Sequence, residues 1–468
     1  MTKPKKFFVT TPIYYINDVP HIGHAYATFA ADILARYHRI VGDKTFFLTG
    51  TDENSQKTVL AAASAKKEIK VYTEELATRW EEAWQKLNIS NDDFIRTTET
   101  RHIKLVQEIF KKIDQKGDLY KGSYVGLYCV GHEAFLKPAD LDEKGLCPDH
   151  KTRPDKISEE NYFFRLSKYQ DVLLKHFKEN PDFVEPKERY NEILNFIKGG
   201  LQDISVTRET QKWGIPSPAD SNQVVYVWFD ALINYISAGP TKWPADIHII
   251  GKDILRFHAV IWPAMLLSAG YPLPKKIFAH GFFTIDGVKI SKSLGNAIDP
   301  LVISEKYGID ALRYYLFKEI PFGNDGDFSF KRLEEVYNAD LANGLGNLVA
   351  RVAKLCEIAG VEINPIKTKP VFDAAYKKAL EELRFQDALS LIWSKITNID
   401  RQIDQSKTWE LIKKDTQKAE AVLTSFVEQI REVQGLLTPF LPTTAAKIAQ
   451  QFAGPKIKSA KPLFPRIK

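Results

Sequence analysis

Two short clusters of residues in this chain have side chains suited to holding phosphate groups. The first, His21-Ile22-Gly23-His24, lies between a predicted strand and a predicted helix. Two imidazoles three residues apart on the first turn of a helix share a face, so both can donate to one phosphate. Gly23 leaves room for a nucleotide to approach the backbone. Taken alone, this four-residue pattern also fits an accidental match.

The second cluster is Lys289-Ile290-Ser291-Lys292-Ser293, which follows a hairpin-like stretch at 281–288. Its two lysines and two serines predict a cationic loop that stabilises charge on a departing phosphate group. An isolated sequence of this kind also fits a solvated basic turn. The two clusters occur in this order on the expected elements, and together they favour a nucleotide site.

A different chemistry is predicted for two Cys-x-x-His pairs. Cys129 and His132 are separated by fourteen residues from Cys147 and His150. Four N and S ligands complete a tetrahedral zinc site and leave no open position, so we expect one structural Zn²⁺. The alternative is a set of buried thiols and surface histidines. Cys356 is the only other cysteine, and three cysteines argue against a disulfide framework.

The elements that must position these residues change in type along the chain. Apolar runs at 6–11 and 45–49 flank a helical pattern at 24–41, which is typical of a parallel α/β sheet. Between about 117 and 221 the pattern turns irregular. It is expected to resume with strands at 224–228, 247–250 and 276–279. Beyond residue 328 the spacing predicts helices only, over 332–359, 372–406, 410–435 and 441–452.

These changes predict an α/β fold: a doubly wound, Rossmann-like parallel sheet with an inserted zinc-binding domain and an all-α C-terminal bundle. Residues 331–468 carry 22 lysines and arginines against 16 acidic residues, whereas the first 330 residues hold 43 of each. This location of the excess charge favours a polyanion partner only weakly over a solvated helical surface. No apolar stretch is long enough for a signal peptide or a membrane span, so we expect a cytoplasmic protein that binds no membrane.

The two phosphate-binding clusters resemble the HIGH and KMSKS motifs of class I aminoacyl-tRNA synthetases, with Ile290 where that class usually has methionine. Further stretches, at 11–17, 50–53, 226–232 and 250–254, are similar to those of methionyl-tRNA synthetases. This resemblance covers nearly the whole chain. It implies an enzyme that uses ATP with Mg²⁺ to form methionyl-adenylate. The methionyl group would then pass to the 3′ end of tRNA(Met), for initiation and elongation of translation.

The resemblance also implies roles for single residues. The residues expected to act catalytically on phosphate charge are His21, His24, Lys289 and Lys292. Those expected to bind ATP are His21, Gly23, His24, Lys252, Asp253, Lys289, Ser291 and Lys292. Those expected to bind methionine are Ile13, Tyr15, Asp52, Trp228, Ala231, Leu232, Tyr235, Ile254 and His258. Asp52 would hold the ammonium group, and Arg208 resembles an arginine near the reacting end of the pocket.

The chemistry of these residue types suits a methionine side chain, because sulfur makes favourable contacts with aromatic rings. Tyr15 and His258 could also donate to the thioether. Purely structural roles stay open for three of the residues. Trp228 and Tyr235 also fit a plain core, and Asp52 also fits a helix cap.

By the same resemblance, Asn347, Arg351 and Trp409 match residues that read the CAU anticodon. Asn347 and Arg351 are four residues apart and therefore share a helix face. Trp409 offers a stacking platform for an unstacked base, or it could simply fill the start of a helix.

Five domains are expected. Residues 1–117 and 222–282 form the two catalytic halves, 118–221 the insertion, 283–330 the region of the cationic loop and the tRNA stem, and 331–468 the anticodon-binding domain. The insertion is too short for the editing domains of the leucine, isoleucine and valine enzymes. No residues are left for the dimerising appendage of some methionine enzymes, so we expect a monomer.

Three alternatives remain from the sequence. A cysteinyl-tRNA synthetase has similar motifs but places a thiolate-binding zinc at the catalytic centre. A nucleotidyltransferase with an H-x-G-H motif would form adenylates without tRNA. A non-enzymatic zinc- and RNA-binding protein would leave both phosphate-binding clusters unexplained.

Overall fold

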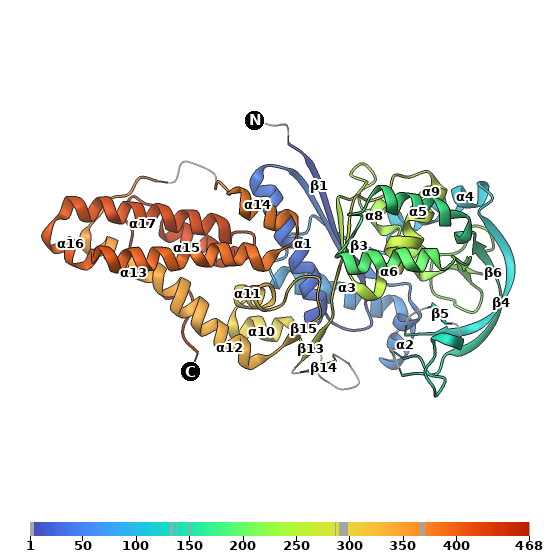
Figure 1. Cartoon of the computed structure of the whole chain (residues 1–468). Helices are drawn as coiled ribbons and strands as arrows, with labels where there is room; N and C mark the ends of the chain where they lie inside the picture. The colour runs from blue at the N-terminus through green and yellow to red at the C-terminus, as the bar shows by residue number, and fades with distance from the viewer. Residues whose placement is uncertain are drawn as a thin grey trace. The chain divides into compact units, whose positions relative to one another are not determined.

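The structure, a computed structural model, describes residues 4–131, 134–136, 138–148, 151–285, 287–289, 298–365 and 370–467. Contacts within the chain divide it into two compact units (Figure 1). We call residues 6–20 and 45–280 the sheet unit. Residues 1–5, 21–44 and 281–468 are the helical unit. No helix within the described ranges has both the length and the apolarity needed to cross a membrane.

The sheet unit is built on a six-stranded sheet of order β3-β2-β1-β11-β12-β7. Its strands are β1 (Lys6–Tyr15), β2 (Lys44–Asp52), β3 (Asp93–Arg96), β7 (Val184–Glu185), β11 (Ile247–Gly251) and β12 (Ile277–His280). The pairs with a described register, β2 with β3, β1 with β11, β11 with β12 and β12 with β7, are all parallel. The order reverses at β1, with β2 on one side and β11 on the other. This confirms the doubly wound sheet, and ligands bind at such reversals beyond the carboxyl ends of the strands.

The helices of the sheet unit bury apolar side chains. They are α2 (Gln56–Ser64), α3 (Ile69–Lys86), α4 (Thr100–Gln115), α5 (Gln170–Glu179), α6 (Lys187–Lys198), α7 (Val227–Ala231), α8 (Asn234–Ser237) and α9 (Trp262–Ala269). In α4, Val106, Ile109, Phe110 and Ile113 recur at helical spacing and are all buried in the core. The Phe110 ring meets Phe229 of α7 edge-on, with centroids 5.8 Å apart. The long helix α4 therefore supports the short helix α7.

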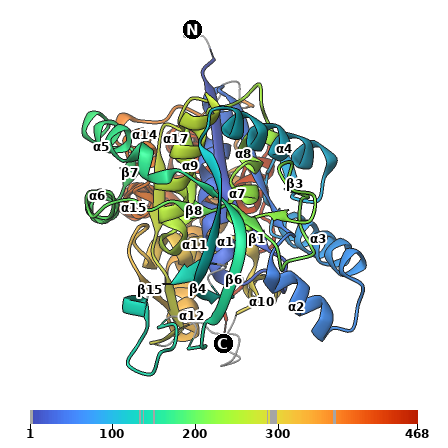
Figure 2. The same cartoon turned by 90° about the vertical axis from the view of Figure 1, so that its right-hand side faces the viewer.

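The predicted insertion contains its own antiparallel sheet, of order β5-β4-β6-β8. The long strands β4 (Leu119–Cys129) and β6 (Asp155–Phe164) run side by side (Figure 2). Strand β5 (Ala134–Leu136) pairs with β4, and β8 (Ile204–Ser205) pairs with β6. Strand β7 also lies within residues 118–221, yet it pairs with β12 at the edge of the six-stranded sheet. The predicted insertion therefore contributes one strand, β7, to the main sheet.

The expected strand at 224–228 is wrong as a strand of the main sheet. Only β10 (Val224–Val225) is extended, and it pairs antiparallel with β9 (Thr207–Arg208) in a separate two-stranded sheet. From Val227 the chain is helical, as α7. A short apolar run with no polar alternation fits a buried helical turn as well as a buried strand, so its periodicity could not distinguish them.

The helical unit holds α1 (Ile22–Val41) and all the helices after residue 299. These are α10 (Pro300–Tyr307), α11 (Ile309–Glu319), α12 (Phe330–Val336), a π-helical segment (Tyr337–Gly346), α13 (Asn347–Ala359), α14 (Ala374–Glu381), α15 (Phe385–Ser406), α16 (Thr408–Lys414), α17 (Thr416–Leu437) and α18 (Pro442–Gln451). The helical C-terminal region is confirmed. A small sheet of order β14-β13-β15 joins β13 (Phe283–Ile285), β14 (Val288–Lys289) and β15 (Gly326–Phe328).

A buried arginine connects α1 to two other parts of the helical unit. Arg313 of α11 and Asp32 of α1 are both fully buried and form an ion pair at 2.8 Å. Arg313 Nε also donates to the carbonyl of Phe440 at 2.7 Å, and Nη2 to that of Pro439 at 3.0 Å. Burial lowers the pKa of Arg313, and the nearby Asp32 carboxylate opposes this effect. One side chain therefore satisfies a carboxylate and two carbonyls in a dry region.

Replacing Arg313 should destabilise the helical unit strongly. In Arg313→Met the buried Asp32 loses its ion pair with Arg313, and two carbonyls lose their donor. We expect a loss of about 3 kcal/mol in the free energy of unfolding, measured from urea unfolding curves. The control is Arg384→Met, which removes exposed pairs with Glu382 and Asp387 and should cost below about 1 kcal/mol. Equal losses would contradict a stabilising role specific to Arg313.

Candidate active site

The histidine pair lies at the start of α1 and caps it. His21 is the N-cap residue, and its Nδ1 accepts the backbone N–H of Gly23 at 3.1 Å. The Nδ1 of His24 accepts the backbone N–H of His21 at 3.2 Å. The two rings stack with their centroids 3.7 Å apart. Because Nδ1 accepts in both rings, the ring proton is on Nε2 in both.

This arrangement suits an anion. Each imidazole carries an Nε2–H donor on the side of the ring away from the cap, and the positive end of the helix dipole attracts negative charge. Gly23 is also required by the His21 ring itself. A Cβ at this position would lie 3.0 Å from His21 Cε1 and 3.2 Å from its Nδ1. A side chain at residue 23 would therefore push against the ring that caps the helix.

The predicted hairpin before the cationic loop is present. Strands β13 and β14 pair antiparallel, with Thr284 opposite Lys289 and Ile285 opposite Val288. The backbone of Lys289 therefore ends β14. Ser291 and Lys292 lie outside the described residues.

Asp52 lies at the carboxyl end of β2 and is 3% exposed. Its Oδ1 accepts the backbone N–H of Asn54 at 3.3 Å. The helix that follows, α2, is capped by Ser55, whose side chain accepts the N–H of Thr58. The alternative that Asp52 caps this helix is therefore wrong. Its position beyond the end of a central strand is the one that favours ligand binding in such sheets.

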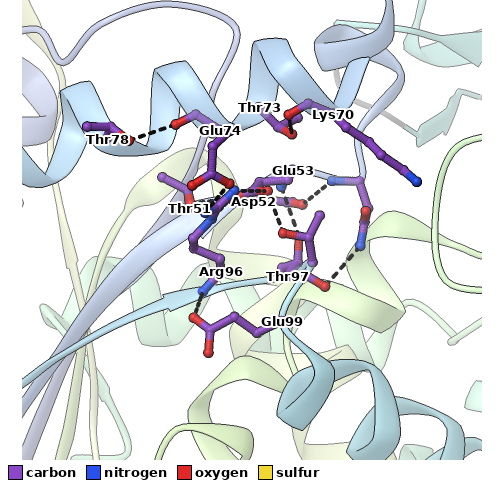
Figure 3. A network of polar contacts seen from close by, with 12 residues as sticks. Thr51, Asp52, Glu53, Lys70, Thr73, Glu74, Thr78, Arg96, Thr97 and Glu99 are labelled. Carbon is purple, nitrogen blue, oxygen red and sulfur yellow. Dashed lines mark hydrogen bonds and ion pairs between the residues drawn. The ribbon is translucent and has the colours of Figure 1, made fainter. Parts of the chain in front are cut away.

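The residue after Asp52 is held from several sides. Glu53 is fully buried, and its carboxylate accepts from Arg96 Nε at 2.6 Å and from Arg96 Nη2 at 3.1 Å. The hydroxyls of Thr51 and Thr98 donate to it as well, at 3.0 and 2.6 Å. Its backbone N–H donates to Thr97 Oγ1 at 2.9 Å, as Figure 3 shows. The end of β2 is thereby fixed against β3 and the loop that follows it.

Four of the predicted methionine-binding side chains gather in the sheet unit. The Trp228 ring lies edge-on to Tyr15 at 6.2 Å and to His258 at 6.3 Å between centroids. Phe257 stacks on Trp228 at 3.8 Å, and Tyr235 OH lies 2.7 Å from His258 Nε2. We call Tyr15, Trp228, Tyr235, Phe257 and His258 the aromatic cluster. The sequence did not single out Phe257, although it adjoins His258.

The hydrogen bonds of His258 fix its protonation. Its Nδ1 lies 2.9 Å from the carbonyl of Ile254, so Nδ1 carries the proton and Nε2 accepts from Tyr235 OH. Burial lowers the pKa of His258 from its ordinary 6.5 to about 4 and raises that of Tyr235. His258 is therefore neutral, and its single proton is already donated. This differs from the expected donor role toward a thioether.

The remaining predicted methionine-binding residues lie near this cluster or on the same elements. Ile13, Leu232 and Ile254 belong to, or pack against, the apolar core that contains Trp228. Ala231 is buried on α7. Arg208 is buried, and its Nη1 donates to Ser205 Oγ at 2.8 Å and to the carbonyl of Thr207 at 2.7 Å.

Lys252 and Asp253 begin a 3₁₀ turn directly after β11. A Cβ on the preceding Gly251 would lie 2.5 Å from Asp253 Oδ1, so a side chain there would displace this carboxylate. Asp253 is exposed and Lys252 is half-buried. Both residues therefore lie at a strand's carboxyl end, as expected of ATP-binding residues.

Half of the predicted zinc ligands can be described. Cys129 ends β4 and Cys147 lies in a turn closed by a bond from the N–H of Lys151 to its carbonyl at 2.8 Å. Both thiols are fully buried. His132 and His150 lie outside the described residues. No group of three or more His, Cys, Asp or Glu that could hold a metal occurs in the described part of the chain.

The three predicted anticodon residues lie in the helical unit. Asn347 is exposed at the start of α13, and Arg351 is one turn further along. The guanidinium of Arg351 lies 5.4 Å above the ring of Trp409 and pairs with Asp404 at 2.6 Å. Trp409 is 42% exposed on the first turn of α16. The alternative that it fills the start of a helix is therefore wrong.

Sequence reasoning missed a fully buried pair, His102 with Asp230, whose His102 Nε2 and Asp230 Oδ1 are 2.6 Å apart. The only signal was an aspartate within the apolar run 224–233, where an unpaired charge would be costly. His102, far away in the sequence, gave no signal of its own.

Comparison with known proteins identifies the class. The family described as tRNA synthetases class I (M) matches residues 7–157 and 150–353. The methionine–tRNA ligase of Thermotoga maritima is 46% identical and aligns with 95% of this chain and 74% of its own length. That of Nostoc is 44% identical, covering 96% of this chain and 90% of the relative.

Solved structures agree with these sequences. The methionyl-tRNA synthetase of Mycobacterium tuberculosis in complex with methionyl-adenylate is similar with a TM-score of 0.91 and 36% identity, over 99% of this chain and 100% of the other. Its apo form gives a TM-score of 0.83 at 34% identity. The chain therefore belongs to the class I tRNA synthetases and, within them, to the methionyl-tRNA synthetase family.

The buried His258 should make stability depend on pH. Below pH 6.5 His258 becomes protonated in the unfolded chain, whereas in the folded chain it stays neutral down to about pH 4. Stability should therefore fall with pH between 6.5 and 4, by about 1.4 kcal/mol per pH unit for this group. Urea unfolding at pH 6.5, 5.5 and 4.5 should show a flatter dependence in His258→Gln than in the wild type. Parallel curves would contradict a neutral buried His258.

Proposed function

We propose that this chain is a methionine–tRNA ligase that activates methionine with ATP and transfers it to tRNA(Met) for translation initiation and elongation. The observation that carries the proposal is the neutral, hydrogen-bonded aromatic cluster around Trp228 and His258. It offers an apolar, uncharged surface to a thioether side chain. The similar Mycobacterium tuberculosis enzyme, in complex with methionyl-adenylate, supports the same assignment. The Thermotoga and Nostoc relatives are methionine enzymes, which gives no support to the cysteine enzyme or to a tRNA-independent nucleotidyltransferase.

The first step is an in-line attack of the methionine carboxylate on the α-phosphate of ATP, which releases pyrophosphate. The Nε2–H groups of His21 and His24 would donate to phosphate oxygens, and Lys289 and Lys292 would stabilise the charge that develops. Gly23 and Ser291 are further proposed ATP-binding residues of the helical unit, and Lys252 and Asp253 are those of the sheet unit. Mg²⁺ bound to the phosphates would neutralise further negative charge. In the second step a ribose hydroxyl of the tRNA 3′ end attacks the carbonyl carbon of methionyl-adenylate, takes the methionyl group and releases AMP.

Methionine would bind in the sheet unit. Asp52 would accept from the ammonium group, and the aromatic cluster would contact the side chain, with Ile13, Ala231, Leu232 and Ile254 beside it. The lowered pKa of His258 leaves its ring uncharged between pH 6 and 8. A neutral ring suits an uncharged side chain, because a charged imidazole would carry a desolvation cost.

The proposed domains follow the boundaries expected from the sequence, at 1–117, 118–221, 222–282, 283–330 and 331–468. In the last of these, Asn347, Arg351 and Trp409 would read the anticodon. Arg351 is already oriented by Asp404 and by the ring of Trp409. A cytoplasmic location and a monomeric state remain predictions.

One Zn²⁺ is proposed to bind Cys129, His132, Cys147 and His150, supported by the burial of both thiols and by the turn at Cys147. Metal analysis of the purified protein should find about one zinc per chain, and less than half of that in Cys147→Ser. Cys356→Ser is the matched control, because Cys356 is also buried but lies on α13. Equal zinc contents in all three proteins would contradict this site.

The tRNA step is tested by charging. Trp409→Ala removes an exposed ring that would stack on an unstacked anticodon base, a contact of about 1–3 kcal/mol. We expect kcat/KM for methionylation of tRNA(Met) to fall about 10- to 100-fold. Methionine-dependent pyrophosphate exchange without tRNA should change less than twofold. The control is Trp393→Phe, which alters a ring stacked on Tyr314 in the same unit. An unchanged charging rate in Trp409→Ala would argue against anticodon reading by this helix.

A further inference from the structure

Asp230 connects two parts of the sheet unit that have separate roles in the proposed methionine site. It is fully buried on α7, two residues after Trp228 and one before Ala231. Its Oδ2 accepts from Asn54 Nδ2 at 2.7 Å. Its Oδ1 lies 2.6 Å from His102 Nε2, which donates because an ionised carboxylate only accepts. Asp230 takes no part in the proposed chemistry, yet it lies among residues that do.

Asn54 carries the connection to Asp52. It follows Asp52 by two residues, and its backbone N–H donates to Asp52 Oδ1 at 3.3 Å. Its Nδ2 also reaches the carbonyl of Thr97 at 3.4 Å, and its carbonyl accepts from Gln211 Nε2 at 3.0 Å. Asn54 is 4% exposed. Asp52 and Asp230 are therefore connected through one buried residue, Asn54, which forms a hydrogen bond with each of them.

His102 orients Asp230 from the other side. Its Nδ1 lies 2.8 Å from Ser237 Oγ, and Ser237 donates its own hydroxyl proton to the carbonyl of Asn234 at 3.0 Å. The ring of His102 is therefore held at both nitrogens, by Asp230 on one side and by Ser237 on the other. His102 and Asp230 are both fully buried.

A buried pair of this kind is not required for stability, because apolar residues of similar size often serve as well. Its position suggests another role. One side of Asp230 is bound to the segment that holds Asp52, and its own helix carries Trp228. The carboxylate therefore sets the separation between the proposed ammonium-binding group and the proposed side-chain surface.

We propose that Asp230, oriented by His102, is a positioning residue for methionine recognition. Through Asn54 it fixes the position of Asp52 relative to Trp228. This inference rests on the proposed function. A ligand that uses both Asp52 and the aromatic cluster depends on the link, whereas a ligand that uses only the cluster does not. Methionine is the first kind. 4-(Methylthio)butyrate, which is methionine without its ammonium group, is the second.

Two variants break the link from opposite ends. Asn54→Ala removes the amide that joins Asp230 to the Asp52 segment. Asp230→Asn replaces one of the two accepting oxygens by an amide nitrogen, which cannot accept. We expect the Kd of methionine, from equilibrium dialysis, to rise about tenfold or more in Asn54→Ala. The Kd of 4-(methylthio)butyrate and the KM for ATP should each change less than twofold.

A matched control separates positioning from plain stability. Asp118 is another fully buried carboxylate of the sheet unit, bound to Lys168, Tyr169 and Ser268. Asp118→Asn should lower the melting temperature, as the link variants do, but leave the ratio of the two Kd values unchanged. If Asp230→Asn does not fold, Asn54→Ala still tests the link, because it keeps the His102–Asp230 pair.

Two results would overturn the inference. One is an equal weakening of both ligands in Asn54→Ala, which would indicate general damage to the pocket. The other is an unchanged Kd for methionine. Failure of the proposed function would look different, because the wild-type chain itself would then not bind methionine.

Discussion

The ion pair between Glu53 and Arg96 is the interaction on which the proposed amino-acid site depends. A fully buried carboxylate is costly unless its oxygens are all satisfied, and here two arginine nitrogens and two threonine hydroxyls supply the donors. The pair joins the end of β2 to the end of β3. Asp52 immediately precedes Glu53, so its backbone cannot shift without breaking these bonds. The exposed bond from Arg96 to Glu74 adds little by comparison, because Glu74 is largely solvated.

The same requirement for paired buried groups governs α1 in the helical unit. At its N-terminus two backbone N–H groups are satisfied by histidine side chains rather than by the usual serine or aspartate. This choice fixes both tautomers and leaves two Nε2–H donors beside a helix N-terminus. Further along the helix, Asp32 is satisfied by Arg313 and Arg36. One helix therefore carries the proposed phosphate donors and a buried anchor to α11.

Much of the fold could be predicted, because parallel strands and helices leave distinct periodic patterns. The helix at 24–41 and the strands at 247–250 and 276–279 were predicted within a few residues. The run at 224–228 could not be, because an uninterrupted apolar stretch has no period that separates a strand from a buried turn. Strand β7 has two residues, which is too short for any pattern.

The residues of the candidate site also fall into a group that the sequence predicted and a group that it could not. Motifs, strand ends and the family resemblance indicated His21, His24, Asp52 and every member of the aromatic cluster except Phe257. The partners that orient them could not be found, since Arg96, His102 and Asn54 contact their targets across 43 to 176 residues of sequence. Their side chains are ordinary in isolation. Only the folded chain brings them together. The tautomers of His21, His24 and His258 likewise follow from hydrogen bonds that form on folding.

Activation of methionine through an adenylate is the step from which every other proposed role follows. The most direct test is exchange of labelled pyrophosphate into ATP, with each of the twenty amino acids offered separately and without tRNA. We expect exchange with methionine and with no other amino acid at comparable concentration. Exchange with cysteine alone, or no exchange with any amino acid in a folded sample, would contradict the proposed activity.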